Sequence, residues 1–502
     1  MKPTRLALIA AAGMLLTSAS VYSLTPPGGA GRGKDQDGPG SARVVAESLA
    51  DKEKDGPAAD PSRFTDGRTL TVDGRLGHSK LVRNEGGKTF LMLEVKPADG
   101  VRAKAPPPAH LSIVIDRSGS MKGARINNAM AAATSAVDRL SDGDLVSVVT
   151  FDTGVQTVVA PTAVDASTRP TIHRAIQGIK LGGDTCISCG VEVGMQLLAQ
   201  TPGKVSRMIL LSDGDANFGI RDVPGFRSLA QRAQGRGVSI TTIGVDVDFS
   251  DKIMTALALD SNGRHYFVAS PAGLSAVFEE EAKSLTSTVA SDAEVAVDLA
   301  PGVELERVVD RTFRRSGNRV VVPLGSFANA DVKTVLLEVK VPSGSLGAVP
   351  VADVGVTYRD LVDGGPGRCG GKLATEMVAT AAEASQLDPV VLGRSQRAET
   401  ARVVREANDL FEKGNAVEAR RRLSAQKAKV EIAAAAAQAA PSNARKADVD
   451  RDFQNQTSVL GDANQGFASP PPAAPGAPAP MPAQAAKAHV KENAKRALDM
   501  AF

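Results

Sequence analysis

The sequence predicts an α/β protein in which a domain with a mostly parallel sheet is inserted in a β-sandwich. Between residues 109 and 288, apolar strand-like runs alternate with helical patterns, which is typical of a parallel sheet covered by helices on both faces. The segments on either side of this stretch alternate apolar and polar residues with a period of two, as half-buried strands do. Because neither flanking block has enough strands for a core of its own, we expect the two blocks to pair with each other.

The elements of the inserted domain follow in a regular order. Each predicted strand is a short apolar run, and each predicted helix carries apolar residues at three- and four-residue spacing. The predicted strands are 111–115, 145–151, 155–159, 208–211, 239–245 and 265–268. The predicted helices are 124–140, 169–179, 187–198, 223–234 and 274–287.

The flanking blocks predict the sandwich and a helical region after it. The predicted sandwich strands are 69–72, 90–95, 294–299, 319–324 and 332–341. Helix formers with apolar residues at helical spacing occupy 373–387 and 397–430, which predicts a small helical region. A stretch dense in Pro and Ala at 469–482 predicts an extended linker within a disordered tail.

These patterns divide the chain into seven predicted segments. Residues 24–63, which are rich in Gly, Pro, Asp and Lys, have the composition of a flexible linker. The predicted segments are 1–23 (signal peptide), 24–63 (flexible linker), 64–107 (first block of the β-sandwich), 108–288 (inserted domain), 289–360 (second block of the β-sandwich), 371–438 (helical region) and 439–502 (Pro/Ala-rich disordered tail).

The amino-terminal residues have the pattern of a secretory signal. Lys2 and Arg5 form a charged start, residues 6–16 form a short apolar core, and small residues follow, with cleavage expected near Ser20 or Ser23. The alternative is an uncleaved anchor. We therefore expect export to the periplasm, the cell surface or the medium. No later segment has the ~18 consecutive apolar residues that span a bilayer, so no transmembrane span is expected after signal removal.

The balance of charge argues against one class of partner. The chain has 502 residues and a net charge of +3, with Lys and Arg spread along its length. A nucleic-acid-binding protein concentrates these residues in a basic surface, so we expect no nucleic-acid partner.

Three short segments lie at the predicted carboxyl ends of strands or just before a helix. Asp116-Arg117-Ser118-Gly119-Ser120 follows a buried strand, Gly182-Gly183-Asp184-Thr185 precedes a helix, and Asp213 closes the strand at 208–211. In open α/β sheets, ligands bind at the carboxyl edge. One carboxylate and two hydroxyls in a tight turn are oxygen ligands suited to a hard divalent cation such as Mg²⁺.

In this order, the three segments resemble the metal-ion-dependent adhesion site of a von Willebrand factor type A (VWA) domain, over roughly residues 109–288. The resemblance implies a Rossmann-like fold. It also implies that Ser118, Ser120 and Thr185 offer hydroxyls to the metal, while Asp116 and Asp213 act mostly through bound water. The implied cofactor is Mg²⁺, or Mn²⁺ or Ca²⁺.

The sequence departs from the family pattern at one position. The usual turn is Gly-Gly-Thr, whereas here Asp184 stands before Thr185. This carboxylate either changes the affinity of the site for the cation and for an acidic partner, or caps the helix that follows.

The three cysteines allow several interpretations in an exported protein. Cys186 and Cys189 form a Cys-x-x-Cys pair directly after Thr185, and Cys369 lies far along the chain. The pair is a possible disulfide that stiffens the turn carrying Thr185. The alternatives are redox control of the metal site, a zinc site with Cys369 as a third thiol, and two inert thiols.

The function predicted from these patterns is that of an exported, non-enzymatic protein-binding module for adhesion or assembly. Hydroxyl ligands neutralise little of a cation's charge, so the metal would capture an exposed Asp or Glu of a protein partner. The alternatives are a scaffold in which the metal only stabilises the fold, and a Cys-x-x-Cys thiol-redox protein. Neither a Gly-x-Ser-x-Gly elbow nor a His-Glu-x-x-His zinc motif occurs in the sequence, so no catalytic residue is predicted.

Overall fold

The computed structural model describes residues 60–102, 108–246, 251–440, 445–468 and 483–501. The predicted signal peptide and almost all of the predicted flexible linker therefore lie outside the described residues, as does the Pro- and Ala-dense stretch at 469–482. Among the described helices, none is long and apolar enough to cross a membrane.

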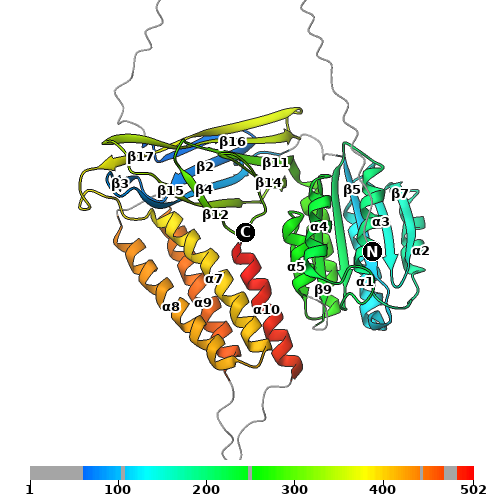
Figure 1. The fold of residues 1–502 in the computed structure, drawn as a ribbon. Helices are drawn as coiled ribbons and strands as arrows, with labels where there is room; N and C mark the ends of the chain where they lie inside the picture. Colours follow the sequence, from blue (N-terminus) through cyan, green and yellow to red (C-terminus); the bar gives the residue numbers. More distant parts are fainter. Residues whose placement is uncertain (1–59, 103–107, 247–250, 441–444, 469–482, 502) are drawn as a thin grey trace, which may run out of the picture. The chain divides into compact units, whose positions relative to one another are not determined.

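A β-sandwich is assembled from strands that lie on both sides of the inserted domain in the sequence (Figure 1). Its five-stranded sheet has the order β1-β2-β4-β15-β12, and its six-stranded sheet has the order β13-β14-β11-β16-β17-β3. The strands are β1 (Arg63–Gly67), β2 (Leu70–Leu76), β3 (Lys80–Val82), β4 (Gly87–Pro97), β11 (Thr288–Leu299), β12 (Glu304–Val308), β13 (Arg314–Ser316), β14 (Arg319–Ala328), β15 (Lys333–Val341), β16 (Gly347–Asp360) and β17 (Pro366–Val378).

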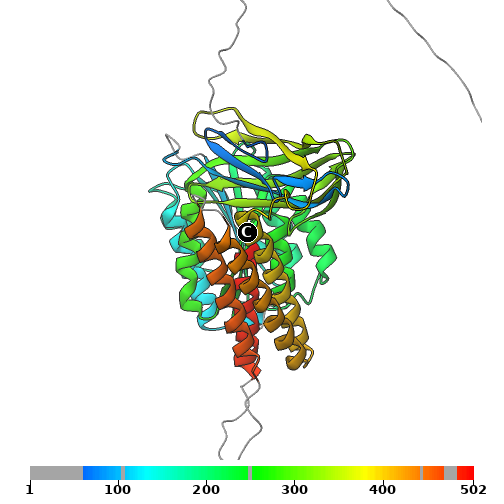
Figure 2. The same ribbon diagram turned by 90° about the vertical axis from the view of Figure 1, so that its left-hand side faces the viewer.

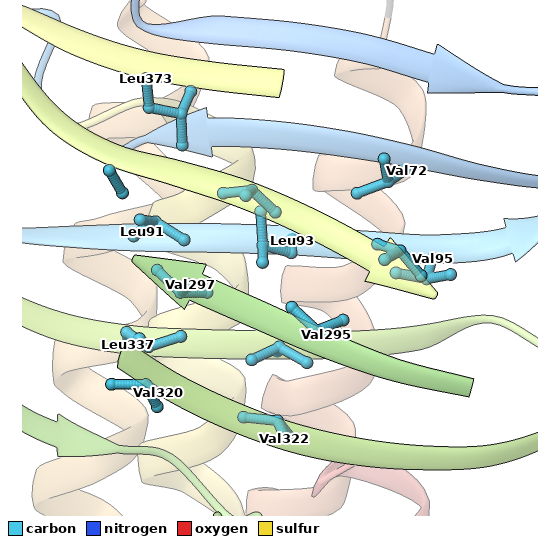
Figure 3. Close-up of a cluster of buried hydrophobic side chains, with 14 of the residues drawn as sticks. Val72, Leu91, Leu93, Val95, Val295, Val297, Val320, Val322, Leu337 and Leu373 are labelled. Carbon is cyan, nitrogen blue, oxygen red and sulfur yellow. The ribbon is translucent and has the colours of Figure 1, made fainter. Parts of the chain in front are cut away.

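Two strand pairings join the early block to the late block. β4 pairs with β15 in antiparallel fashion, with Leu93 opposite Val335, and β3 pairs with β17 in parallel fashion. Buried residues alternate along β2, as the period-two pattern predicts. Figure 3 shows Leu91 and Leu93 from the early block packed among Val295, Val297 and Leu337 from the late block. The predicted inserted architecture is thus confirmed.

The inserted domain contains a six-stranded sheet of order β10-β9-β8-β5-β6-β7, in which every neighbouring pair is parallel except β6 with β7. Its strands are β5 (Ala109–Asp116), β6 (Leu145–Phe151), β7 (Val155–Ala163), β8 (Val205–Ser212), β9 (Val238–Val245) and β10 (His265–Val268). Its α-helices are α1 (Ala124–Arg139), α2 (Arg169–Gln177), α3 (Ile187–Ala199), α4 (Val223–Gln234), α5 (Asp251–Asp260) and α6 (Leu274–Thr286). Two apolar clusters cover the two faces, one with α1, α2 and α6 and the other with α3, α4 and α5. All eight residues of β5 are buried, which explains its apolar sequence.

Within the described part of the chain, four helices follow the sandwich and lie side by side in both views (Figures 1 and 2). They are α7 (Pro389–Glu412), α8 (Ala416–Ala439), α9 (Lys446–Gly466) and α10 (Ala483–Ala501). Asp388 caps α7 by accepting hydrogen bonds from the backbone N–H groups of Val390 and Val391. Buried side chains of all four helices share one apolar cluster.

The structure differs from the predicted boundaries at two places. The helix expected at 373–387 begins inside β17, where Leu373, Thr375 and Met377 alternate toward the core. The sandwich therefore extends beyond residue 360, because β17 pairs along almost the whole of β16. The segment 439–502, predicted as a disordered tail, contains α9 and α10. Along α9 the buried residues Val449, Phe453 and Leu460 recur at helical spacing within a polar segment.

The sandwich core gives a direct test of the split architecture. Leu93 is fully buried on β4 between the two sheets. We expect Leu93→Ala to lower the free energy of unfolding by about 2–5 kcal/mol, because it removes buried methyl groups and leaves a cavity. Leu346→Ala is the matched control, since Leu346 is 55% exposed. Urea denaturation of both variants measures the difference, and equal losses would contradict the placement of β4 in the core.

A buried histidine at the start of β5 predicts a pH dependence of stability. The two ring nitrogens of His110 lie 2.7 and 3.1 Å from the hydroxyl oxygens of Thr201 and Ser147. Burial, assisted by Lys204, lowers the pKa of His110 to about 4. The unfolded chain therefore takes up this proton first as the pH falls, and the associated stability is complete above pH ~6.5 and lost as pH falls to ~4.

We expect this contribution to be on the order of 1–3 kcal/mol. His110→Gln should flatten the dependence of the urea midpoint on pH between 7 and 5, because glutamine does not titrate. His173→Gln, at a half-buried position on α2, serves as the control. An unchanged pH dependence in His110→Gln would contradict the prediction.

Candidate metal-ion site

Strand pairing brings two of the three predicted site segments to one edge of the sheet. β5 and β8 are parallel neighbours, with Ile115 opposite Leu211. Asp116 at the end of β5 therefore lies beside Ser212 at the end of β8, and Asp213 follows directly. Both segments begin at the carboxyl edge, where the sequence predicts the site.

Two backbone hydrogen bonds tie the third segment to the first. The N–H of Gly182 donates to the carbonyl oxygen of Arg117 at 2.7 Å, and the N–H of Gly119 donates to the carbonyl oxygen of Gly183 at 3.1 Å. The turn before α3 is thus held against the turn after β5. This contact places Thr185 near the serine hydroxyls.

The predicted hydroxyl ligands converge. The Oγ atoms of Ser118 and Ser120 are 3.0 Å apart, and Ser120 Oγ donates to Asp213 Oδ1 at 2.7 Å. A Cβ atom on Gly214 would lie 3.5 Å from Ser120 Oγ and 3.6 Å from Thr185 Oγ1. Oxygen atoms from three separate loops therefore lie near one another beside Gly214.

Asp116 uses both carboxylate oxygens to hold the site together. Oδ1 accepts a hydrogen bond from the backbone N–H of Ser118 at 2.8 Å, and Oδ2 accepts one from Ser212 Oγ at 2.6 Å. The side chain is fully buried. Burial raises the pKa of Asp116 to about 6, in spite of these hydrogen bonds, and the nearby Asp213 adds to the rise.

Arg125 belongs to the site but was not predicted from the sequence. Its Nη1 donates to Asp213 Oδ2 and to the carbonyl oxygen of Ser120, both at 2.8 Å, and its Nη2 lies 2.5 Å from Asp246 Oδ2. Asp246 has a φ of 63°, a left-handed conformation that asparagine and aspartate tolerate best among non-glycine residues. Burial raises the pKa of Asp213, while Ser120 and Arg125 act in the opposite direction.

A signal for Arg125 does exist in the sequence. It lies in the first turn of α1, just after the motif. Helical side chains point toward the amino terminus of their helix, so an arginine at this position reaches back over the preceding loop. Arg125 reaches over this loop to Asp213 and Asp246, two carboxylates that other loops bring to the same edge.

Asp184 is exposed and lies two positions before the N-cap residue of α3, which is Cys186. The predicted capping role of Asp184 is therefore not what the structure shows. The backbone N–H of Asp184 donates to Thr153 Oγ1 at 2.9 Å, which anchors the turn instead.

Cys186 and Cys189 form a disulfide, with their Cα atoms 5.4 Å apart. The predicted disulfide is thereby confirmed, and the pair is not available as two thiols for zinc. Cys369 is a free, buried cysteine on β17. Within the described stretches of the chain, no group of three or more His, Cys, Asp or Glu side chains could hold a metal ion.

The donor set at the carboxyl edge nevertheless fits a hard cation. Oxygen is the only donor element in the side chains of this set, which consists of three hydroxyl residues and two carboxylates, Ser118, Ser120, Thr185, Asp116 and Asp213. Ser120 is exposed, whereas the other four are buried. The cluster therefore reaches solvent at Ser120.

Residues 110–280 match the family model of the von Willebrand factor type A domain. The chain therefore contains a VWA domain, as the three sequence segments predict. The match covers the parallel sheet and the helices around it, but not the sandwich or the helices α7 to α10.

Three curated relatives are similar to a portion of this chain. An uncharacterized protein of Synechocystis sp. is 25% identical over 51% of this chain and 63% of its own length. The uncharacterized protein YfbK of Escherichia coli is 25% identical over 43% of this chain and 37% of its own. The inter-alpha-trypsin inhibitor heavy chain H4 of Homo sapiens is 27% identical over 48% of this chain and 27% of its own. The matched region thus spans less than two thirds of each relative.

Two solved structures share the fold over most of the chain. The von Willebrand factor type A protein from Catenulispora acidiphila has a TM-score of 0.69 and 16% identity, over 87% of this chain and 98% of its own. The ArnB paralog VWA2 from Sulfolobus acidocaldarius has a TM-score of 0.59 and 17% identity, over 86% and 99%. At these identities the likeness shows the fold alone, and it extends beyond the VWA domain.

Arg125 yields a prediction about stability. Arg125→Gln leaves the buried carboxylate of Asp213 without its cationic partner, so we expect a loss of about 1–3 kcal/mol in metal-free buffer. Millimolar Mg²⁺ should recover some of this loss, because a divalent cation supplies positive charge at the same carboxylate. Urea denaturation in EDTA and in Mg²⁺ measures both effects.

The matched control is Arg139→Gln on the same helix. Arg139 pairs with Glu279 at 2.7 Å, and its side chain is 59% exposed. An exposed pair contributes little, so this variant should be within about 0.5 kcal/mol of the parent protein in either buffer. A loss in Arg125→Gln that Mg²⁺ does not change would contradict the prediction.

Proposed function

We propose that this protein is an exported, non-enzymatic protein-binding module that captures an acidic side chain of a protein partner through a divalent cation. The VWA domain supports a role in protein interaction. The observation that carries the finer proposal is the convergence of the Ser118, Ser120 and Thr185 hydroxyls with Asp213 at an exposed edge of the sheet.

The residues around this space determine what chemistry it supports. Ser118, Ser120 and Thr185 would hold Mg²⁺, Mn²⁺ or Ca²⁺, with Asp116 and Asp213 behind them. When bound, the cation supplies a Lewis-acidic centre that accepts a carboxylate. Neutral hydroxyls offset little of its charge, and Arg125 already engages one oxygen of Asp213. Both features leave an attraction for an acidic group from outside the chain.

Export is supported by the cysteine chemistry. Disulfides persist in oxidising compartments, and the Cys186–Cys189 disulfide lies within the VWA domain. The secretory pattern of the first residues points the same way. The proposed location is the periplasm, the cell surface or the medium.

Two alternatives are less well supported by the contacts. A metal that only stabilises the fold is not needed to join the loops, because direct hydrogen bonds between Gly182 and Arg117 and between Ser120 and Asp213 already do so. In a thiol-redox enzyme an accessible thiolate attacks the substrate, whereas Cys186 is fully buried and only Cys189 is half-buried.

The metal site is tested with Mn²⁺ as a probe. We expect Ser118→Ala to weaken Mn²⁺ binding by at least about tenfold, measured by electron paramagnetic resonance of free Mn²⁺, because it removes one hydroxyl oxygen. The far-UV circular dichroism spectrum should not change. Ser228→Ala, at an exposed serine on α4, is the matched control and should bind as the parent does. Equal Mn²⁺ affinity in Ser118→Ala and Ser228→Ala would contradict the proposed site.

Capture of a partner requires a second measurement. Immobilised protein should retain envelope proteins in Mg²⁺ but not in EDTA, and Ser118→Ala should retain none of these in either buffer. Blocking the carboxyl groups of a retained protein should abolish its binding. Retention that is equal in Mg²⁺ and EDTA would contradict the role of the cation while leaving the fold assignment intact.

A further inference from the structure

The disulfide stands directly beside one of the proposed ligands. It closes the first turn of α3, and Cys186 follows Thr185 in the chain. The backbone N–H of Cys186 donates to the carbonyl oxygen of Asp152 at 2.9 Å, which anchors the turn to the end of β6. The position of Cys186 therefore helps to define the position of its covalent neighbour Thr185.

Hydrogen bonds hold the loop after β8 against the same turn. The backbone N–H of Thr185 donates to Asn217 Oδ1 at 2.7 Å, and the N–H groups of Asn217 and Phe218 donate to the carbonyl oxygen of Thr185 at 3.1 and 3.2 Å. The N–H of Ile220 donates to Ser188 Oγ at 3.0 Å. This loop also begins with Asp213, so two of the three site loops form one hydrogen-bonded unit.

Gly219 allows this loop to approach the sulfur atoms of the disulfide closely. It has a φ of 71°, and a Cβ atom at this position would lie 2.6 Å from both Cys186 Sγ and Ser188 Oγ. The space between this loop and the disulfide therefore does not accommodate an added methyl group. Bonded sulfur atoms lie ~2.0 Å apart, whereas non-bonded heavy atoms need about 3.5–4.0 Å, so two thiols occupy more space than one disulfide.

We propose that the redox state of Cys186 and Cys189 regulates the affinity of the cation site. This inference rests on the proposed metal site and names its regulation. In the oxidised state the disulfide fixes Thr185 and supports the loop that starts at Asp213. In the reduced state the separated sulfur atoms displace Gly219, and the oxygens from the two loops no longer face one space.

The exposure of the two sulfur-bearing residues defines the chemistry. Cys189 is half-buried and Cys186 is fully buried, so a thiolate of a dithiol reductant attacks Cys189 Sγ. The bond between the two sulfurs breaks, and Cys186 leaves as a thiolate that takes up a proton. The second thiol of the reductant then displaces Cys189, which is also protonated. Two electrons and two protons pass from the dithiol to the protein, and the reductant becomes a disulfide.

The test compares Mn²⁺ affinity of the full chain in three states: oxidised, reduced with a dithiol that is removed by anaerobic desalting, and reoxidised. We expect the dissociation constant to rise at least about fivefold on reduction and to return on reoxidation. A Cys186→Ser/Cys189→Ser double variant should bind Mn²⁺ more weakly than the oxidised protein, because it lacks the bond that fixes Thr185, and should not respond to the dithiol. Cys369→Ser should respond as the parent protein does, because Cys369 lies on β17, away from the disulfide.

A glycine pair tests the steric step without any redox chemistry. Gly219→Ala should weaken Mn²⁺ binding in the oxidised protein, because its methyl group meets Cys186 Sγ. Gly203→Ala is the matched control, since Gly203 has a φ of 84° but nothing within 4 Å of the added atom. It carries the same backbone strain, and its Mn²⁺ affinity should not change.

The possible results separate a failure of the proposed redox regulation from a failure of the proposed metal site. Equal affinity in the oxidised and reduced states overturns the regulation while the metal site stands. Reduction that abolishes the far-UV circular dichroism spectrum also overturns it, because the disulfide would then maintain the fold and not the site. Absence of Mn²⁺ binding in every state, with Ser118→Ala no different, overturns the proposed function and this inference with it.

Discussion

The site depends on the parallel pairing of β5 with β8. This pairing sets Asp116 beside Ser212, and the hydrogen bond from Ser212 Oγ to Asp116 Oδ2 fixes the alignment of the two strand ends. A slip of one residue would turn each of these side chains to the opposite face of the sheet. The two carboxylates of the site would then no longer lie at the same point. The other contacts at the carboxyl edge can form only when the two strands pair in this register.

The balance of charge at the edge follows from a small number of contacts. Asp116 is held by two hydrogen bonds, and Asp213 is shared between Ser120 and Arg125. The guanidinium of Arg125 thus neutralises some of the negative charge of Asp213 that would otherwise attract a cation. The same contact prevents two buried carboxylates from repelling each other without compensation. Hydrogen bonds and one ion pair thus satisfy both carboxylates within the chain, and of the two it is Asp213 that contacts a cationic side chain.

Much of the fold could be predicted from the sequence because β5, β6, β8 and β9 are buried on both faces and read as continuous apolar runs. Asp116, Ser118, Ser120 and Asp213 could be singled out because they follow such runs, and Thr185 because it precedes a helical pattern. Arg125 was missed because its partner Asp213 lies 88 residues away in the chain, and only the folded structure brings them together. The strand β17 was mistaken for a helix because small residues obscure its period-two pattern, and α9 was missed because its apolar face is narrow.

The way the domain is inserted keeps its carboxyl edge away from both covalent connections to the sandwich. The chain enters at the amino end of β5, whose first residue is Ala109. After β10 the helix α6 runs back toward the amino edge, and β11 of the sandwich begins two residues after its end. Both covalent connections to the sandwich therefore leave from the amino edge, whereas Ser118, Thr185 and Asp213 lie at the carboxyl edge. The loops that carry Ser118, Thr185 and Asp213 therefore contain neither of the two connections to the sandwich.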